Sequence, residues 1–139
     1  MIYLRVRDEC QSGVIIGLHM LLKKIVCLLK EYSFSFNDIW IVLKEEHPVE
    51  LEDLEGKLKN TVNPVLYSFH EIFEITKYIE QVIECRIECF DKFNNSKCFS
   101  KKNKLTIDLV DSSFWEFRSN DMALVKSLSK GFINYEILA

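Results

Sequence analysis

Residues 105–117 read LTIDLVDSSFWEF, and this stretch decides the fold class of the chain. Apolar and polar side chains alternate from Leu105 to Val110, and residues 114–118 are rich in aromatic side chains; both patterns are typical of β-strands. Asp111, Ser112 and Ser113 lie between the two strands, where their short polar side chains predict a tight turn or a bulge. The stretch therefore predicts two consecutive strands.

A helix and a last strand are expected to follow this pair. Ser119 or Asn120 is a suitable N-cap. A helical face is then formed by Met122, Val125 and Leu128. Gly131 stands where a C′ residue is expected, and residues 132–138 have the composition of a closing strand. Consecutive strands joined by short connections favour an antiparallel sheet in this half of the chain.

The period of the apolar residues predicts the elements nearer the N-terminus. They are a strand over 1–7, a long buried helix over 14–31 capped by Ser12, a buried strand over 39–43 that contains Trp40, a short helix over 50–61, a brief strand over 65–69, a helix from 72 to about 84 and a strand over 86–92. Residues 83–93 fit a helix or a strand, and residues 94–103 are expected to form an exposed loop. The prediction is an α+β fold, a single domain over residues 1–139, with a central mixed, largely antiparallel sheet and about four packed helices.

Composition excludes several classes of protein. The chain has 139 residues, of which 48% are hydrophobic and 28% charged, so a folded domain is expected rather than disorder. The net charge of −3 disfavours a general nucleic-acid binder, which would carry a basic excess. The 4 glycines form no phosphate-binding loop. Residues 14–29 are apolar but include Lys23 and Lys24, so we expect no membrane span.

The five cysteines are expected to be free thiols. An odd number cannot pair completely within one chain, and residues 1–7 do not resemble a signal peptide, so we expect a cytoplasmic location. Cys85, Cys89 and Cys98 are spaced Cys-x3-Cys-x8-Cys, without the paired short spacings of a zinc site. We therefore expect no metal ion and no cofactor.

No catalytic motif surrounds the residues that could act as nucleophile or base. Ser112 and Ser113 lack a Gly-x-Ser-x-Gly elbow and are well explained as turn formers. His19 lies in an apolar segment, where a hydrogen-bonded core histidine is the ordinary interpretation. A small hydrolase that uses a Cys or Ser with His70 stays open as an alternative, although we expect no enzyme.

An acidic segment, residues 45–56, is the most distinctive charged feature. It contains six carboxylates and no Lys or Arg. The six are Glu45, Glu46, Glu50, Glu52, Asp53 and Glu55. Acidic side chains favour the start of a helix, which explains part of the cluster. The other interpretation is a surface that steers and orients a basic protein partner.

The aromatic residues after the turn offer a second candidate surface. In a strand, Phe114 and Glu116 share one face while Trp115 and Phe117 share the other. If one face packs in the core, the other exposes an aromatic ring, and Phe114 or Trp115 could anchor a partner.

Residues 105–138 resemble the immunity proteins of contact-dependent growth inhibition and related polymorphic toxin systems in bacteria. The resemblance rests on a strand ending in Asp-Ser-Ser-Phe-Trp, a second strand, a capped helix and the terminal run GFINYEIL over 131–138. It implies a non-enzymatic antitoxin that binds a basic toxin C-terminal domain, with a nuclease as the expected toxin, and blocks its active site or substrate surface. It implies neither direct nucleic-acid nor membrane binding, and a monomer or weak homodimer when free. A self-associating structural adaptor stays open beside the hydrolase.

Overall fold

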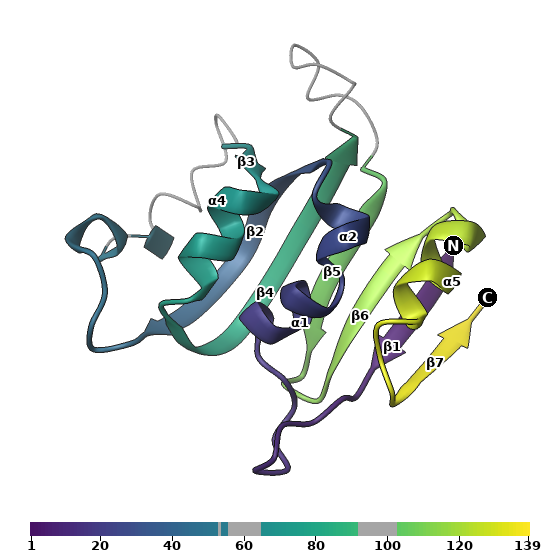
Figure 1. Ribbon diagram of the computed structural model, residues 1–139, viewed down its shortest axis with the longest axis horizontal. Coiled ribbons are helices and arrows are strands. Elements are labelled where there is room, and N and C mark those ends of the chain that lie inside the picture. The colour runs from purple at the N-terminus through teal and green to yellow at the C-terminus, as the bar shows by residue number, and fades with distance from the viewer. Residues whose placement is uncertain (53, 56–64, 92–102) are drawn as a thin grey trace.

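The computed structural model describes residues 1–52, 54–55, 65–91 and 103–139. The strands within these ranges form one seven-stranded sheet in the order β3-β2-β4-β5-β6-β1-β7 (Figure 1). Their bounds are β1 Ile2–Val6, β2 Tyr32–Leu43, β3 Tyr67–Ser68, β4 Ile79–Asp91, β5 Leu105–Val110, β6 Phe114–Ser119 and β7 Tyr135–Leu138. Every strand pair of this sheet is antiparallel, so the α+β class and the antiparallel character are confirmed, and no parallel pair makes the described sheet mixed.

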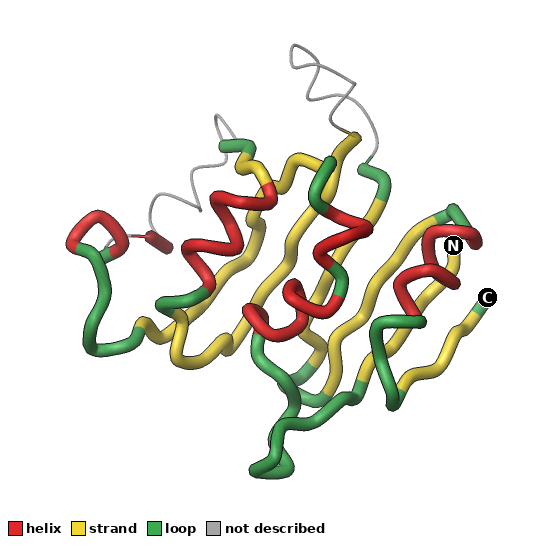
Figure 2. The backbone as a smooth tube through the Cα atoms, in the orientation of Figure 1, coloured by secondary structure: helices red, strands yellow, loops and turns green. Residues whose placement is uncertain are grey.

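Four α-helices of the described ranges cover one face of the sheet, as Figure 2 also shows. They are α1 Leu18–Lys24, α2 Val26–Leu29, α4 Phe69–Thr76 and α5 Met122–Ser129. The hydrophobic core lies between these helices and the inward side chains of the strands, among them Leu4, Phe34, Ile87 and Phe117, each 0% exposed. The opposite face of the sheet carries no helix in the described part of the chain.

The long helix predicted over residues 14–31 is wrong in its first turn and in its continuity. Residues 11–14 form a turn, after which Ile15 bridges to Glu9 and Ile16 donates its N–H to the carbonyl oxygen of Asp8 (3.0 Å). The N-cap of α1 is therefore Gly17, and the predicted cap at Ser12 is wrong. The helix is then interrupted at Ile25, whose φ of −123° and ψ of 18° lie outside the helical region. Gly131 explains why α5 can approach this break: a Cβ at residue 131 would lie 3.0 Å from the Lys24 carbonyl oxygen.

The predicted helix over 72–84 is correct only to Thr76. Residues 79–84 belong instead to the long strand β4, which pairs with β2 along most of its length. Ile79, Val82 and Ile83 are β-branched and favour a strand, although their spacing also fits one helix face. Pairing with the adjacent strand decides between the two, and it also settles residues 83–91 as a strand.

The C-terminal third forms as predicted, including the tight turn, with two shifts in detail at the cap of α5 and at the start of the last strand. In the turn between β5 and β6, Asp111 (φ 48°) and Ser112 (φ 54°) both adopt the left-handed conformation. Asp121, rather than Ser119 or Asn120, caps α5 by accepting the N–H of Leu124 (3.1 Å). The last strand begins at Tyr135 instead of residue 132.

The segment after β2 is described only in part. A short 3-10 helix, η1, spans Val49–Leu51, and residues 54–55 are helical. The remainder of the helix predicted over 50–61, and most of the loop predicted over 94–103, fall outside the described residues. The brief strand predicted over 65–69 is shorter in the structure, where β3 covers Tyr67–Ser68 and Phe69 is the first residue of α4.

Candidate partner-binding face of the sheet

The helix-free face of the sheet carries a row of charged side chains, which we call the ionic row. Strand register places Arg86, Asp108, Glu116, Arg5 and Glu136 on five successive strands, β4, β5, β6, β1 and β7. Alternation along each strand sends these side chains away from the helices, because their neighbours in sequence face the core. The row therefore runs across the centre of the open face.

Asp108 is the hub of one half of this row. Arg86 donates from Nε to Oδ1 of Asp108 (2.8 Å), and Arg118 donates from Nη2 to Oδ2 (2.6 Å). The Asp108 side chain is only 11% exposed, so the two guanidinium groups supply the charge balance that a buried carboxylate needs. The hydrogen bond that Arg86 donates to Asp108 is the largest cause of a raised pKa of Arg86, and the negative charge of Asp108 is the next.

Phe114 packs beside the other half of the row, which consists of Glu116, Arg5 and Glu136. Glu116 accepts from Nε of Arg5 (3.1 Å) and Glu136 accepts from Nη1 of Arg7 (2.9 Å). The guanidinium carbons of Arg5 and Arg7 lie 5.2 and 4.7 Å from the centre of the Phe114 ring. Cation–π contacts of this kind hold the two arginines against the sheet.

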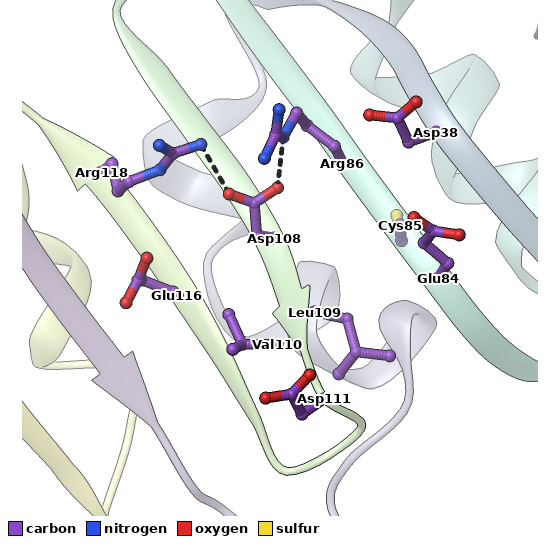
Figure 3. A pocket seen from close by; sticks show the side chains of 10 residues that line it. All are labelled: Asp38, Glu84, Cys85, Arg86, Asp108, Leu109, Val110, Asp111, Glu116 and Arg118. Carbon is purple, nitrogen blue, oxygen red and sulfur yellow. Dashed lines mark hydrogen bonds and ion pairs between the residues drawn. The ribbon is translucent and has the colours of Figure 1, made fainter.

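A pocket of about 320 Å³ opens on this face between β2, β4, β5 and β6 (Figure 3). Its charged lining consists of the carboxylates Asp38, Glu84, Asp108, Asp111 and Glu116 and the guanidinium groups of Arg86 and Arg118. Both arginines are bonded to Asp108, and Glu116 is paired with Arg5. The other three carboxylates form no ion pair with the described residues, so the pocket is acidic.

Trp40 and Val42 lie beside this pocket on the same face. Ile39 and Ile41 are buried under the helices, and alternation places Trp40 and Val42 on the opposite side. Trp40 is 54% exposed, so the prediction of a buried tryptophan is wrong. The reason is that β2 lies near the edge of a sheet covered on one side only. Trp40 pairs in register with Glu84 of the pocket lining.

The acidic segment predicted from the sequence is placed only in part. Glu45, Glu46, Glu50 and Glu52 are exposed, whereas Asp53 lies outside the described residues. Glu55 is half-buried and accepts the backbone N–H of Ile41 (2.7 Å). This bond ties the segment to β2, close to Trp40, and gives Glu55 a structural role in addition to its charge.

The two aromatic candidates of β6, Phe114 and Trp115, lie on opposite faces of the sheet. Trp115 is 1% exposed and donates from Nε1 to the carbonyl oxygen of Ile16 (2.8 Å), so it is a core residue and cannot anchor a partner on this surface. Phe114 lies on the open face beside Glu116, as the predicted division of the strand requires.

The histidines and cysteines of the described ranges form no nucleophile–base pair. His19 bonds through Nδ1 to the hydroxyl of Thr76 (3.0 Å) and stacks on Phe73, and burial lowers its pKa, with a further contribution from Lys77. His19 is half-buried, so it is a hydrogen-bonded histidine at the edge of the core rather than a fully buried one. Burial raises the pKa of the Cys85 thiol at the pocket, which keeps it protonated.

The part of the chain that the structure describes contains no group of three or more His, Cys, Asp or Glu residues arranged to hold a metal ion. None of its helices is long and apolar enough to cross a membrane.

Several residues of the open face could not be identified as site residues from local sequence patterns. Asp38, Arg86 and Asp108 are isolated charges in sequence and converge only through strand register. The alternation of Thr106 and Asp108 with apolar residues in LTIDLV was the available signal, since it marks an outward polar side. Comparison with protein-family models, curated proteins and solved structures finds no match to the chain.

Proposed function

We propose that this chain is an immunity protein that binds and neutralises the toxin domain of a contact-dependent growth inhibition or related polymorphic toxin system. The observation that carries the proposal is the open sheet face, which combines fixed charges with an exposed tryptophan. Tryptophan and arginine are the side chains most enriched among the energetically dominant residues of protein interfaces. Such a surface suits protein binding better than small-molecule turnover.

The order of elements in the C-terminal third adds support. Strand β5, the Asp-Ser-Ser turn, strand β6, helix α5 and strand β7 follow one another as the resemblance to immunity proteins requires. A fold alone does not specify a function, so the weight of the proposal stays on the surface.

Charge suggests the class of toxin. The pocket and the acidic segment both present carboxylates, and the toxin surface that best complements them is basic. A nuclease carries such a surface where it binds phosphates. The immunity protein would act without catalysis, by occupying that basic cleft or its rim and excluding the nucleic acid.

The direct test is neutralisation of the toxin domain encoded next to this gene. We expect co-expression of the chain to restore growth of bacterial cells that express the domain, and the two purified proteins to co-elute. If the chain neither restores growth nor co-elutes with the toxin domain, the proposed immunity function is refuted.

The contribution of the acidic segment can be tested separately. Reversing Glu46 and Glu52 to Lys should slow association by about tenfold at low salt, because carboxylates that steer a basic partner act on the association rate. The association rate should also become less sensitive to salt. Glu74→Lys on α4, on the helix face, is the control, because it makes the same charge reversal outside the acidic segment. An unchanged association rate would remove the acidic segment from the interface.

A further inference from the structure

We infer that Trp40 and the acidic pocket beside it form the docking surface for a basic partner, with a Lys or Arg side chain of that partner entering the pocket. The inference rests on the proposed function and specifies it, because it selects one region of the open face and the chemistry that the region accepts. Three observations carry it: an uncovered apolar pair, an excess of carboxylates and a cavity of suitable size.

The apolar pair is Trp40 and Val42. They are 54% and 43% exposed and lie on a sheet face that no described helix covers. A large exposed ring costs hydrophobic free energy in the free protein, and a partner that buries it recovers that free energy. Neighbouring positions Ile39 and Ile41 show that the strand continues to place apolar side chains in the core, so the exposure of Trp40 follows from alternation rather than from local unfolding.

The charge of the pocket selects the partner. Its five carboxylates face two guanidinium groups, and both of these are already bonded to Asp108. Asp38, Glu84 and Asp111 make no ion pair with the described residues. A cation entering the pocket could therefore pair with these carboxylates without displacing an existing salt bridge. A hydrated anion or a nucleic-acid phosphate would meet this excess of carboxylates, although Nε of Arg118 is buried without a hydrogen-bond partner among the described residues.

The size of the cavity fits one long side chain. A volume of about 320 Å³ exceeds that of a single water molecule many times over and accommodates a guanidinium or ammonium group with part of its stem. Glu84 links the pocket to Trp40, since the two residues are register partners on adjacent strands. Aliphatic parts of the entering chain can therefore pack on the indole ring while its charged end reaches the carboxylates.

A second copy of this chain is a less suitable occupant. Pairing two open faces would bring the two acidic pockets into the same interface, and like charges brought together there oppose association. We therefore infer that the occupant of this surface is a basic partner. Self-association would be detected as a dimer of the free chain.

The first experiment uses a probe that does not require the toxin. N-acetyl-arginine amide is titrated into the isotopically labelled chain, followed by NMR, with N-acetyl-citrulline amide as the neutral control of similar shape. We expect arginine-dependent shift changes at Glu84, Asp111 and the Trp40 indole, and we expect them to be lost in Asp38→Asn/Asp111→Asn. Asparagine tolerates the left-handed backbone of both positions, so this variant removes charge without adding strain. Equal responses to the two probes, or no response at the pocket, would overturn the inference.

The second experiment uses the toxin domain. Trp40→Ser and Asp38→Asn/Asp111→Asn should each weaken its binding at least about tenfold, as expected for residues at the centre of an interface. Glu74→Gln on α4, which removes one exposed carboxylate from the helix-covered side of the molecule, is the matched control and should bind as the wild type does. If the wild type neutralises the toxin and the pocket variants do so equally well, the docking surface is wrong while the proposed function stands. If sedimentation shows a dimer of the free chain that Trp40→Ser abolishes, the occupant is a second copy and the inference is overturned.

Discussion

Replacing Asp108 with Asn should destabilise the fold, because Asp108 is the shared acceptor of two guanidinium groups. Its carboxylate, 11% exposed, accepts hydrogen bonds of 2.8 Å from Arg86 and 2.6 Å from Arg118. A hydrogen bond to a charged group contributes about 1.5–3 kcal/mol. The arginine side chains are 46% and 29% exposed, so solvent screening reduces each contribution. Asn retains one acceptor and turns an N–H₂ group toward an arginine. The expected net loss is about 2 kcal/mol.

This loss can be measured by urea and thermal unfolding. An unfolding entropy of about 2.1 cal/mol/K per residue gives about 0.29 kcal/mol/K for 139 residues, so a loss of about 2 kcal/mol lowers Tm by about 7 °C. Glu136→Gln is the control, because its side chain is 44% exposed and its ion pairs should contribute less than about 1 kcal/mol. If Asp108→Asn unfolds within about 0.5 kcal/mol of the wild type, Asp108 does not organise the ionic row in the manner described.

Three further predictions concern other parts of the molecule. Iodoacetamide should label the exposed thiols of Cys10 and Cys27 in the folded chain, as mapped by mass spectrometry. The buried thiols of Cys85 and Cys89 on β4 should react only after unfolding, because burial raises their pKa. Labelling of all four thiols at one rate would contradict this. Ser112→Gly should raise the free energy of unfolding by about 0.5–1 kcal/mol, because Ser112 has a φ of 54° and glycine adopts that conformation without strain; a lower Tm would be the contrary result. Burial lowers the pKa of His19 below 6.5, so its contribution to stability is present above pH 6.5 and is lost as the pH falls through the folded pKa. His19→Gln should therefore flatten the loss of stability on acidification. An identical pH profile of the variant would exclude His19 as a source of that loss.

The C-terminal third was predictable from its sequence because its signals are local. Alternation in LTIDLV, the turn residues 111–113 and a short amphipathic helix each specify their own structure, and strand, turn and helix form as expected. The division of Phe114 from Trp115 was also predictable, since adjacent residues of a strand face opposite sides. The local sequence could not predict which of the two sides of β6 is covered, because that depends on where the helices pack.

The predictions that are wrong concern segments whose structure is decided by residues distant in sequence. Residues 79–84 have a spacing that fits a helix face, and pairing of β4 with β2 makes them a strand. Trp40 is flanked by buried isoleucines and was expected to be buried with them, but the sheet is covered on one side only. Asp108 and Arg86 meet through register across strands 22 residues apart in sequence, which no local pattern encodes.

We propose that a basic toxin domain docks on the open sheet face at Trp40, and ¹⁹F NMR of the tryptophans tests this claim directly. The chain has two tryptophans, Trp40 on that face and Trp115 in the core, so a chain labelled with 5-fluorotryptophan gives two ¹⁹F resonances that Trp40→Phe assigns. Adding the unlabelled toxin domain should shift or broaden the Trp40 resonance and leave that of Trp115 in place. A toxin domain that co-elutes with the chain while the Trp40 resonance stays unchanged would contradict the claim.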